Sequence, residues 1–129
     1  MAKKIVTKKP KTIITTGNGK IFVSTTFNNT IVTITNEKGD AIAWSSAGNA
    51  GFKGTRKSTP FAATSAVEQA IQKAKEVGVN SVEVFIKGPG VGRDAALRAV
   101  RNSGLSISMI ADVTPIPHNG PRQKKKRRA

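Results

Sequence analysis

Two runs of basic residues, one at each end of the chain, most constrain what the chain can fold into. The last ten residues, 120–129, hold six positive charges, the first eleven hold five lysines, and neither run contains an acidic residue. Like charges side by side repel one another and remain in water, so neither run can join a hydrophobic core. We therefore expect one folded domain at residues 17–114, between a disordered basic arm at 1–16 and a basic, proline-containing tail at 115–129.

The net charge of +15 predicts a polyanionic partner. The two basic runs contain half of the 22 lysines and arginines and none of the 7 acidic residues. Such a charge indicates nucleic acid or, with less support, an anionic membrane surface. The chain has no cysteine, which excludes disulfides, thiol catalysis and cysteine-ligated zinc. No apolar run reaches the ~20 residues of a membrane helix, and none suits a signal peptide, so we expect a soluble intracellular protein.

The first half of the domain has the composition of β-structure. Stretches rich in β-branched and aromatic residues predict three strands, at 21–27, 30–37 and 41–46. Asn28–Asn29 suits a two-residue hairpin turn, because asparagine tolerates a positive φ. These strands should form an antiparallel meander.

The second half alternates helices and strands. Thr59 can cap a helix, Pro60 suits its first position, and Gly78 suits its end, with apolar residues between them at spacings of three and four. A strand at 82–86, a helix at 92–102 and a strand at 105–110 follow. This order, βββαβαβ, predicts an α/β domain with a mixed five-stranded sheet, antiparallel at one side and parallel at the other.

A glycine-rich loop at 88–92 joins the fourth strand to the second helix. Amide groups at a helix N-terminus bind phosphate, and glycines let the phosphate approach. The loop matches neither the Walker nor the dinucleotide motif, so a tight turn that needs glycine is an equal alternative. Lys87 precedes the loop, and a helical wheel places Arg93, Arg98 and Arg101 on one broad arc, which favours RNA contact over a solvated face.

A second basic, glycine-rich loop lies at residues 51–58. Its cations Lys53, Arg56 and Lys57 suit phosphate contacts, although a solvated loop is the alternative. Phe52 could stack on an unpaired base, but we favour a packing role for its ring.

An enzyme is not expected. A two-metal nuclease needs clustered carboxylates, whereas the acidic residues here are scattered over turns, helices and single strand positions. A catalytic triad would have to recruit His118, the single histidine, from the tail. We therefore expect neither a metal nor a cofactor, and assign His118 to stacking or hydrogen bonding with RNA, or to a plain surface position.

Four stretches resemble the bacterial type of the small-subunit ribosomal protein eleven family. They are FNNTIVTIT at 27–35, KSTPFAA at 57–63, KGPG at 87–90 and DVTPIPHNG at 112–120, within a similarity that spans about 18–129. The resemblance implies a ribonuclease H-like fold without nuclease carboxylates. It also implies a structural constituent of the small ribosomal subunit that bridges helices of the ribosomal RNA on the platform, near the Shine–Dalgarno cleft. Ribosomal proteins seven and eighteen would be neighbours, with initiation factor three and messenger RNA nearby.

The resemblance and the arginine arc together assign RNA contact to one set of residues. The set comprises Lys53, Arg56, Lys57, Lys87, Gly88, Gly90, Arg93, Arg98, Arg101, His118, Asn119, Arg122, Lys124, Lys125, Lys126, Arg127 and Arg128. The tail is expected to be disordered in the free protein and ordered inside the ribosome. We expect a cytoplasmic ribosome, and the ribosome of an organelle is the alternative. A DNA-compacting architectural protein and a ribonuclease H-like enzyme are the other classes. The first lacks a minor-groove wedge or dimer helix, and the second lacks the carboxylates.

Overall fold

A computed structural model describes residues 17–125 of the chain, with the side chains of Thr55 and Arg56 left out. Predictions made on residues 1–16, on residues 126–129 and on the Arg56 side chain therefore lie outside the described part. The elements in chain order are β1 (Asn18–Thr25), β2 (Thr30–Asn36), β3 (Ala41–Ser46), the short 3₁₀ helix η1 (Gly54–Ser58), α1 (Pro60–Val77), β4 (Ser81–Lys87), α2 (Gly92–Asn102) and β5 (Ser106–Asp112). This is the predicted order βββαβαβ.

The five strands form one mixed sheet in the order β3-β2-β1-β4-β5. β2 pairs antiparallel with β1 and β3, whereas β4 pairs parallel with β1 and β5. The predicted antiparallel and parallel sides are therefore confirmed, and β1 lies in the centre, where the two sides meet.

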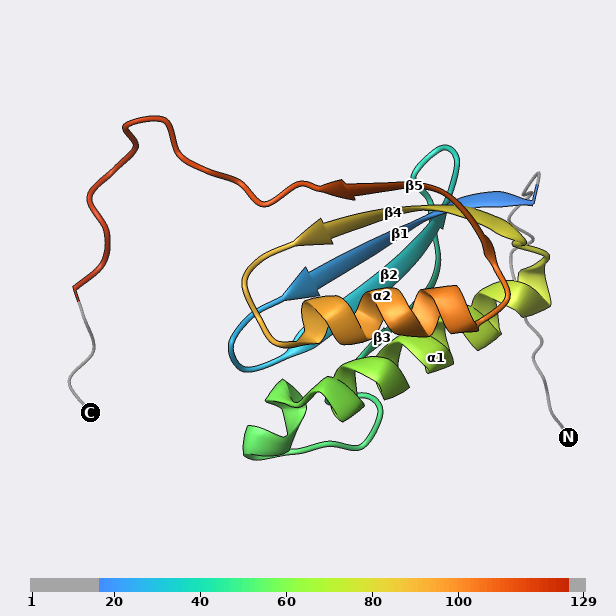
Figure 1. The fold of residues 1–129 in the computed structure, drawn as a ribbon, viewed down its shortest axis with the longest axis horizontal. Coiled ribbons are helices and arrows are strands. Elements are labelled where there is room, and N and C mark those ends of the chain that lie inside the picture. The colour runs from blue at the N-terminus through green and yellow to red at the C-terminus, as the bar shows by residue number, and fades with distance from the viewer. Residues whose placement is uncertain (1–16, 126–129) are drawn as a thin grey trace, which may run out of the picture.

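Both α-helices pack on the same face of this sheet (Figure 1). Alternate residues of the central strands point toward the helices, and Ile21, Val23, Ile34 and Val84 are fully or almost fully buried there. Within residues 17–125, no helix covers the opposite face of the sheet. We call that second surface the open face.

The predicted ends of α1 are confirmed. The Thr59 hydroxyl accepts a hydrogen bond from the Ala62 amide at 3.2 Å, and Pro60 occupies the first turn. Gly78 ends the helix with a φ of 110°, a left-handed conformation that glycine adopts without a steric penalty. Local chemistry alone therefore sets both ends of this helix.

The predicted two-residue turn at Asn28–Asn29 is wrong. The last pair of the β1–β2 ladder is Thr25 with Thr30, so residues 26–29 form a four-residue loop. The Thr26 hydroxyl accepts from the amides of Asn28 and Asn29 at 3.2 and 3.1 Å, and the Thr26 amide donates to the Asn29 carbonyl at 2.9 Å. These side-chain bonds satisfy the turn amides and favour the longer loop.

Candidate nucleic-acid interface

Gly88, the first residue of the β4–α2 loop, forms hydrogen bonds through both its amide and its carbonyl group. Its amide donates to the Thr114 hydroxyl at 3.1 Å. Its carbonyl accepts from the Thr25 hydroxyl at 3.1 Å and from Arg93 Nη1 at 2.8 Å. The loop is thus tied at its start to β1, to α2 and to the beginning of the tail.

The glycines of this loop let it pack closely on the β1–β2 loop and α1. A Cβ at Gly90 would lie 2.6 Å from the Thr26 carbonyl oxygen, which no side chain tolerates. A Cβ at Gly92 would overlap the Thr30 hydroxyl and lie 3.0 Å from the Ala63 Cβ. Internal packing therefore accounts for these glycines, as in the tight-turn alternative, without requiring a phosphate at the same place.

Arg93 and Asp112 form a charged hydrogen bond between the first turn of α2 and the end of β5. Arg93 Nη2 donates to Asp112 Oδ2 at 2.7 Å, and Asp112 Oδ1 accepts from the Thr114 hydroxyl at 2.6 Å and the Thr114 amide at 3.0 Å. The Val113 amide donates to the Ile86 carbonyl at 2.8 Å. We call Arg93, Asp112 and Thr114 the clasp, because together they fix where the tail leaves the sheet.

The electrostatics of the clasp favour an ionised Asp112. The Thr114 hydroxyl, then the Arg93 guanidinium and the Thr114 amide, hold the pKa of the Asp112 carboxyl well below its usual range. The side chains of Arg93 and Asp112 are 32% and 54% exposed, so water still reaches the pair. Arg93 is therefore already engaged within the protein, and an RNA contact by Arg93 remains a prediction.

The other predicted cations of β4 and α2 lie on the surface of the molecule. Lys87, Arg98 and Arg101 are exposed, and Ala96 and Val100 on the same helix as the arginines are buried. The helix therefore turns Arg98 and Arg101 to solvent and its small apolar residues to the core.

The second basic loop also presents cations to solvent. Lys53 is exposed, whereas Lys57 is half-buried, with its stem beside Gly48. Phe52 packs edge-on against Phe61, with ring centroids 5.6 Å apart and planes at 83°. This contact supports the packing role for Phe52 rather than stacking on a base.

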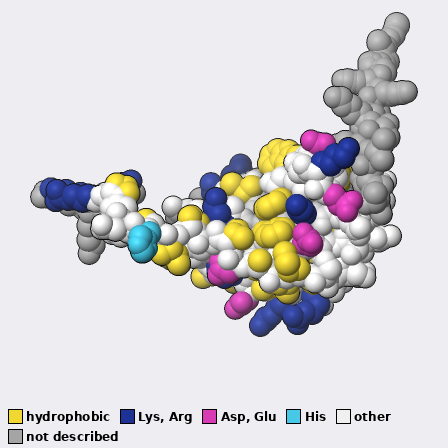
Figure 2. Space-filling model, turned by 90° about the horizontal axis from the view of Figure 1, so that it is seen from above, with side chains coloured by type: hydrophobic (Ala, Val, Ile, Leu, Met, Phe, Trp, Pro, Cys, Tyr) yellow, Lys and Arg dark blue, Asp and Glu magenta, His cyan; other side chains and the backbone are white. Residues whose placement is uncertain are grey.

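The tail runs outward from the end of β5 without regular structure (Figure 1). Figure 2 shows its single histidine on the tail, between the body of the molecule and the basic side chains at the far end. Asn119 has a left-handed φ of 58°, and a Cβ on Gly120 would lie 2.8 Å from the Pro117 Cβ, so the chain bends tightly here. The predicted contact residues of the described tail are all exposed: His118, Asn119, Arg122, Lys124 and Lys125. Lys126, Arg127 and Arg128 lie outside the described residues.

Sequence reasoning brought Lys87, Gly88 and Arg93 together, and the structure adds the partners that hold them. Asp112 and Thr114 were not predicted as functional residues. Their spacing was the available signal, since an aspartate two residues before a threonine commonly closes a local hydrogen-bonded turn. In Figure 1 the segment 51–58 leads into α1, the β4–α2 loop leads into α2, and the tail runs away from the body, so the predicted contacts come from three different segments.

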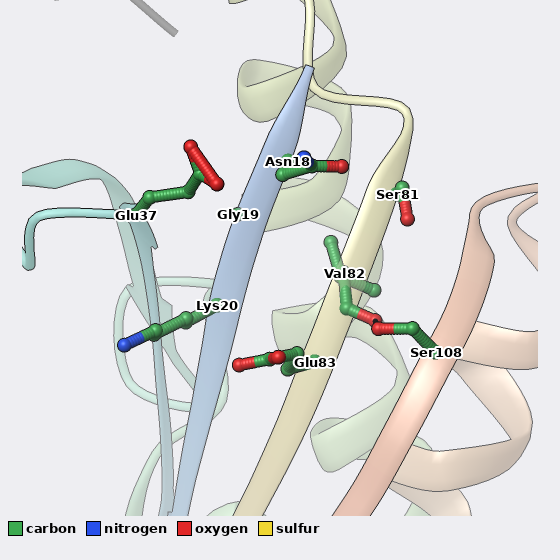
Figure 3. Close-up of a pocket in the computed structure, with 8 residues that line it drawn as sticks. All are labelled: Asn18, Gly19, Lys20, Glu37, Ser81, Val82, Glu83 and Ser108. Atoms are coloured by element: carbon green, nitrogen blue, oxygen red, sulfur yellow. Dashed lines mark hydrogen bonds between the residues drawn. The ribbon is translucent and has the colours of Figure 1, made fainter. Parts of the chain in front are cut away.

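A pocket of about 490 Å³ lies on the open face, at the end of the sheet where β1 and β4 begin (Figure 3). Figure 3 shows its charged side chains, which are Lys20 of β1, Glu83 of β4 and Glu37 in the turn just after β2. In residues 17–125, no group of three or more His, Asp or Glu side chains is placed to hold a metal ion. No helix within the same residues has the length and apolar character to span a membrane.

These observations define a class of protein. A compact mixed sheet carries exposed cations on the loop at Lys53, at the end of β4, on one helix and on an extended tail, which is the form of a basic protein that binds a large anionic partner through several surfaces.

Comparison with known proteins identifies the family. Residues 19–128 match the family model described as "Ribosomal protein S11", and the chain belongs to this family. It is 54% identical over 112 residues to "Small ribosomal subunit protein uS11" of Borreliella burgdorferi (strain ZS7), covering 87% of this chain and 86% of that protein. It is 50% identical over 125 residues to the protein of the same name from Christiangramia forsetii, covering 97% and 94%. The chain is thus a ribosomal protein, a component of a ribonucleoprotein in translation, and the matched relatives are ribosomal proteins and not enzymes.

Proposed function

We propose that the chain is a structural constituent of the small ribosomal subunit that binds and bridges helices of the small-subunit ribosomal RNA. The observation that carries the proposal is the family match over residues 19–128, together with relatives named as small-subunit proteins. Following the family resemblance, we place the protein on the platform, near the cleft that holds the Shine–Dalgarno duplex. A cytoplasmic ribosome is the proposed location.

Three separate surfaces would make the RNA contacts. The first comprises Lys53, Arg56 and Lys57, the second comprises Arg98 and Arg101 of α2, and the third comprises the tail from His118 to Arg128 together with Lys87, which lies at the end of β4 beside the root of the tail. Because one chain carries all three, RNA segments bound to them would be held close to one another. We assign Gly88, Gly90 and Arg93 mainly to building the loop and aiming the tail, since their bonds and close contacts are internal.

Binding would rest on charge neutralisation and on the shape of the folded RNA. Each phosphate contact releases a counterion, so about 8 contacts would lower the affinity by roughly 10³-fold or more between 50 and 200 mM salt. Ribose 2′-hydroxyl groups and the A-form geometry distinguish RNA from DNA. The protein should therefore prefer ribosomal RNA to duplex DNA of equal length, and equal affinity would favour the DNA-compacting alternative.

Protein neighbours follow from the same placement. The family resemblance suggests ribosomal proteins seven and eighteen beside this chain, with initiation factor three and messenger RNA nearby. These partners are proposed from the family and not from any contact seen in the fold.

Crosslinking in cells, followed by sequencing of the attached RNA, tests the function directly. We expect a few discrete sites, all in the small-subunit ribosomal RNA, and expect them to fall in more than one helix. Crosslinks spread over many RNA species, or sites confined to one helix, would contradict the bridging role. A catalytically inactive RNA-binding protein, whose binding sites on RNA are already known, is processed in parallel. It controls for background crosslinks to abundant RNA.

A further inference from the structure

A row of side chains that are apolar except for Thr33 crosses the open face. The strand register places Trp44 of β3, Thr33 of β2, Phe22 of β1, Phe85 of β4 and Ala111 of β5 at successive positions across the sheet. The rings of Phe22 and Phe85 stack, with centroids 5.1 Å apart and planes at 15°. The row therefore crosses the whole sheet and has a stacked aromatic pair at its centre.

Several large apolar side chains on this face are open to solvent. Trp44 is 56% exposed, Ile31 44%, Met109 42% and Phe22 39%. Seen from the sheet side, hydrophobic side chains gather in the middle of the molecule, and both basic and acidic side chains surround them (Figure 2). A sheet with one solvated face usually carries polar residues on that face, so the fold alone does not account for this row.

The charge around the row argues for one kind of partner. Lys20 and Lys87 point to this face, but Glu83 stands opposite Lys20 in the β1–β4 register, and Glu37 lies beside them in the pocket of Figure 3. These charges balance, although the chain as a whole carries +15. An RNA segment would gain little here, because a polyanion binds where positive charge is in excess.

Hydroxyl groups complete the surroundings of the row. Ser24 and Ser46 lie in register with Ile31, on one side of the row, and Lys87 lies opposite Ser24. An exposed apolar patch with a polar, charge-balanced rim is the composition of a protein–protein contact surface.

We infer that the open face, defined by Phe22, Ile31, Trp44, Phe85 and Met109, is a docking surface for a segment of another protein that presents large aliphatic or aromatic side chains. The charge-balanced rim suits a partner segment that carries few charges of its own. The inference goes beyond RNA binding: the loops and the tail would hold RNA, while the open face would hold a protein on the opposite side of the sheet from the helices. The proposed partner is a different protein. Binding of a second copy of this chain, or of an RNA segment, would contradict the inference.

Site-specific photocrosslinking distinguishes these occupants. A benzophenone amino acid replaces Trp44 or Phe22 in the tagged full chain, the complexes containing the chain are irradiated, and mass spectrometry identifies the attached group. We expect a peptide from another protein at both positions. A crosslinked nucleotide, a peptide from a second copy, or no crosslink at either position would overturn the inference. The same amino acid at Gln72, an exposed position on α1, is the control for random capture.

A pair of substitutions with matched exposure tests the surface energetically. Ile31 on the open face is 44% exposed and Val77 at the end of α1 is 43% exposed. We expect Ile31→Ser to lower the yield of the Trp44-position peptide crosslink by about fivefold or more, which is the scale of losing one buried aliphatic contact. Val77→Ser should leave the yield unchanged, and equal yields for both variants would contradict the inference.

Both variants are first checked for native circular dichroism, so that an unfolded variant is not mistaken for a lost contact. If the chain does not enter small subunits at all, the proposed function fails while the crosslinked peptide still reports on the docking surface. The two ideas can therefore fail separately.

Discussion

The guanidinium of Arg93, in the first turn of α2, donates to the carboxylate of Asp112, at the end of β5, over 2.7 Å. The same carboxylate accepts two hydrogen bonds from Thr114, the second residue after the strand. One aspartate thus joins a helix start, a strand end and the root of the basic tail. Because the tail carries much of the charge proposed to meet RNA, this bond links the fold to the binding surface.

Asp112→Asn should loosen the root of the tail without unfolding the protein. The amide keeps the shape but loses the charge that Arg93 and Thr114 engage, so the tail becomes less preorganised and the affinity for ribosomal RNA falls by roughly threefold. Amide exchange at Val113 and Thr114 should accelerate, as measured by NMR. Asp94→Asn, which changes the net charge equally on the exposed side of α2, is the matched control; if it has the same effects, the clasp is not their cause.

The Asp112 carboxyl should remain ionised when the solution is acidified from neutral to about pH 4, the range in which an ordinary aspartate begins to take up a proton. Its pKa is lower in the folded than in the unfolded state, so its contribution to stability is fully present above the unfolded value and is lost as the pH falls toward the folded value. The carboxyl carbon shift of Asp112, followed by NMR, reports this titration. Arg93→Ala should move the midpoint upward, and a native midpoint near pH 4 would be evidence against the clasp.

Gly90→Ala should destabilise the fold by about 1–3 kcal/mol, the usual range for overpacking, because the new Cβ would lie 2.6 Å from the Thr26 carbonyl oxygen. Urea denaturation of the free protein measures this. Gly48→Ala is the control, since its Cβ would have no neighbour nearer than 3.7 Å. If Gly90→Ala kept full stability and lost RNA affinity, close approach of a phosphate would be the better explanation of this glycine.

Arg98→Ala and Arg101→Ala should each weaken ribosomal RNA binding and lower the slope of log affinity against log salt by about 1. Both side chains are exposed, so the melting temperature of the free protein should hardly change. Lys73→Ala, an exposed cation on α1, is the control for net charge. An unchanged salt slope in both arginine variants would remove this helix from the proposed interface.

Much of the fold could be predicted from local chemistry. The ends of α1 depend on Thr59, Pro60 and Gly78, and each acts on its own backbone neighbours. The strands follow from β-branched residues, and the family follows from short motifs such as residues 112–120. The β1–β2 loop was misjudged because the Thr26 hydroxyl, a competing local partner, outweighed the preference of two asparagines for a tight turn.

The order of elements, the charged ends and the family could be read from the residues in sequence. The contacts between distant residues became visible only in the folded chain. Arg93 and Asp112 are 19 residues apart, and Gly90 packs against a loop more than 60 residues earlier. The row from Trp44 to Phe85 likewise exists only because strand pairing sets a register. The physical reason is that propensity and capping act within a few residues, whereas register, close packing and charge pairing depend on the position of the whole sheet.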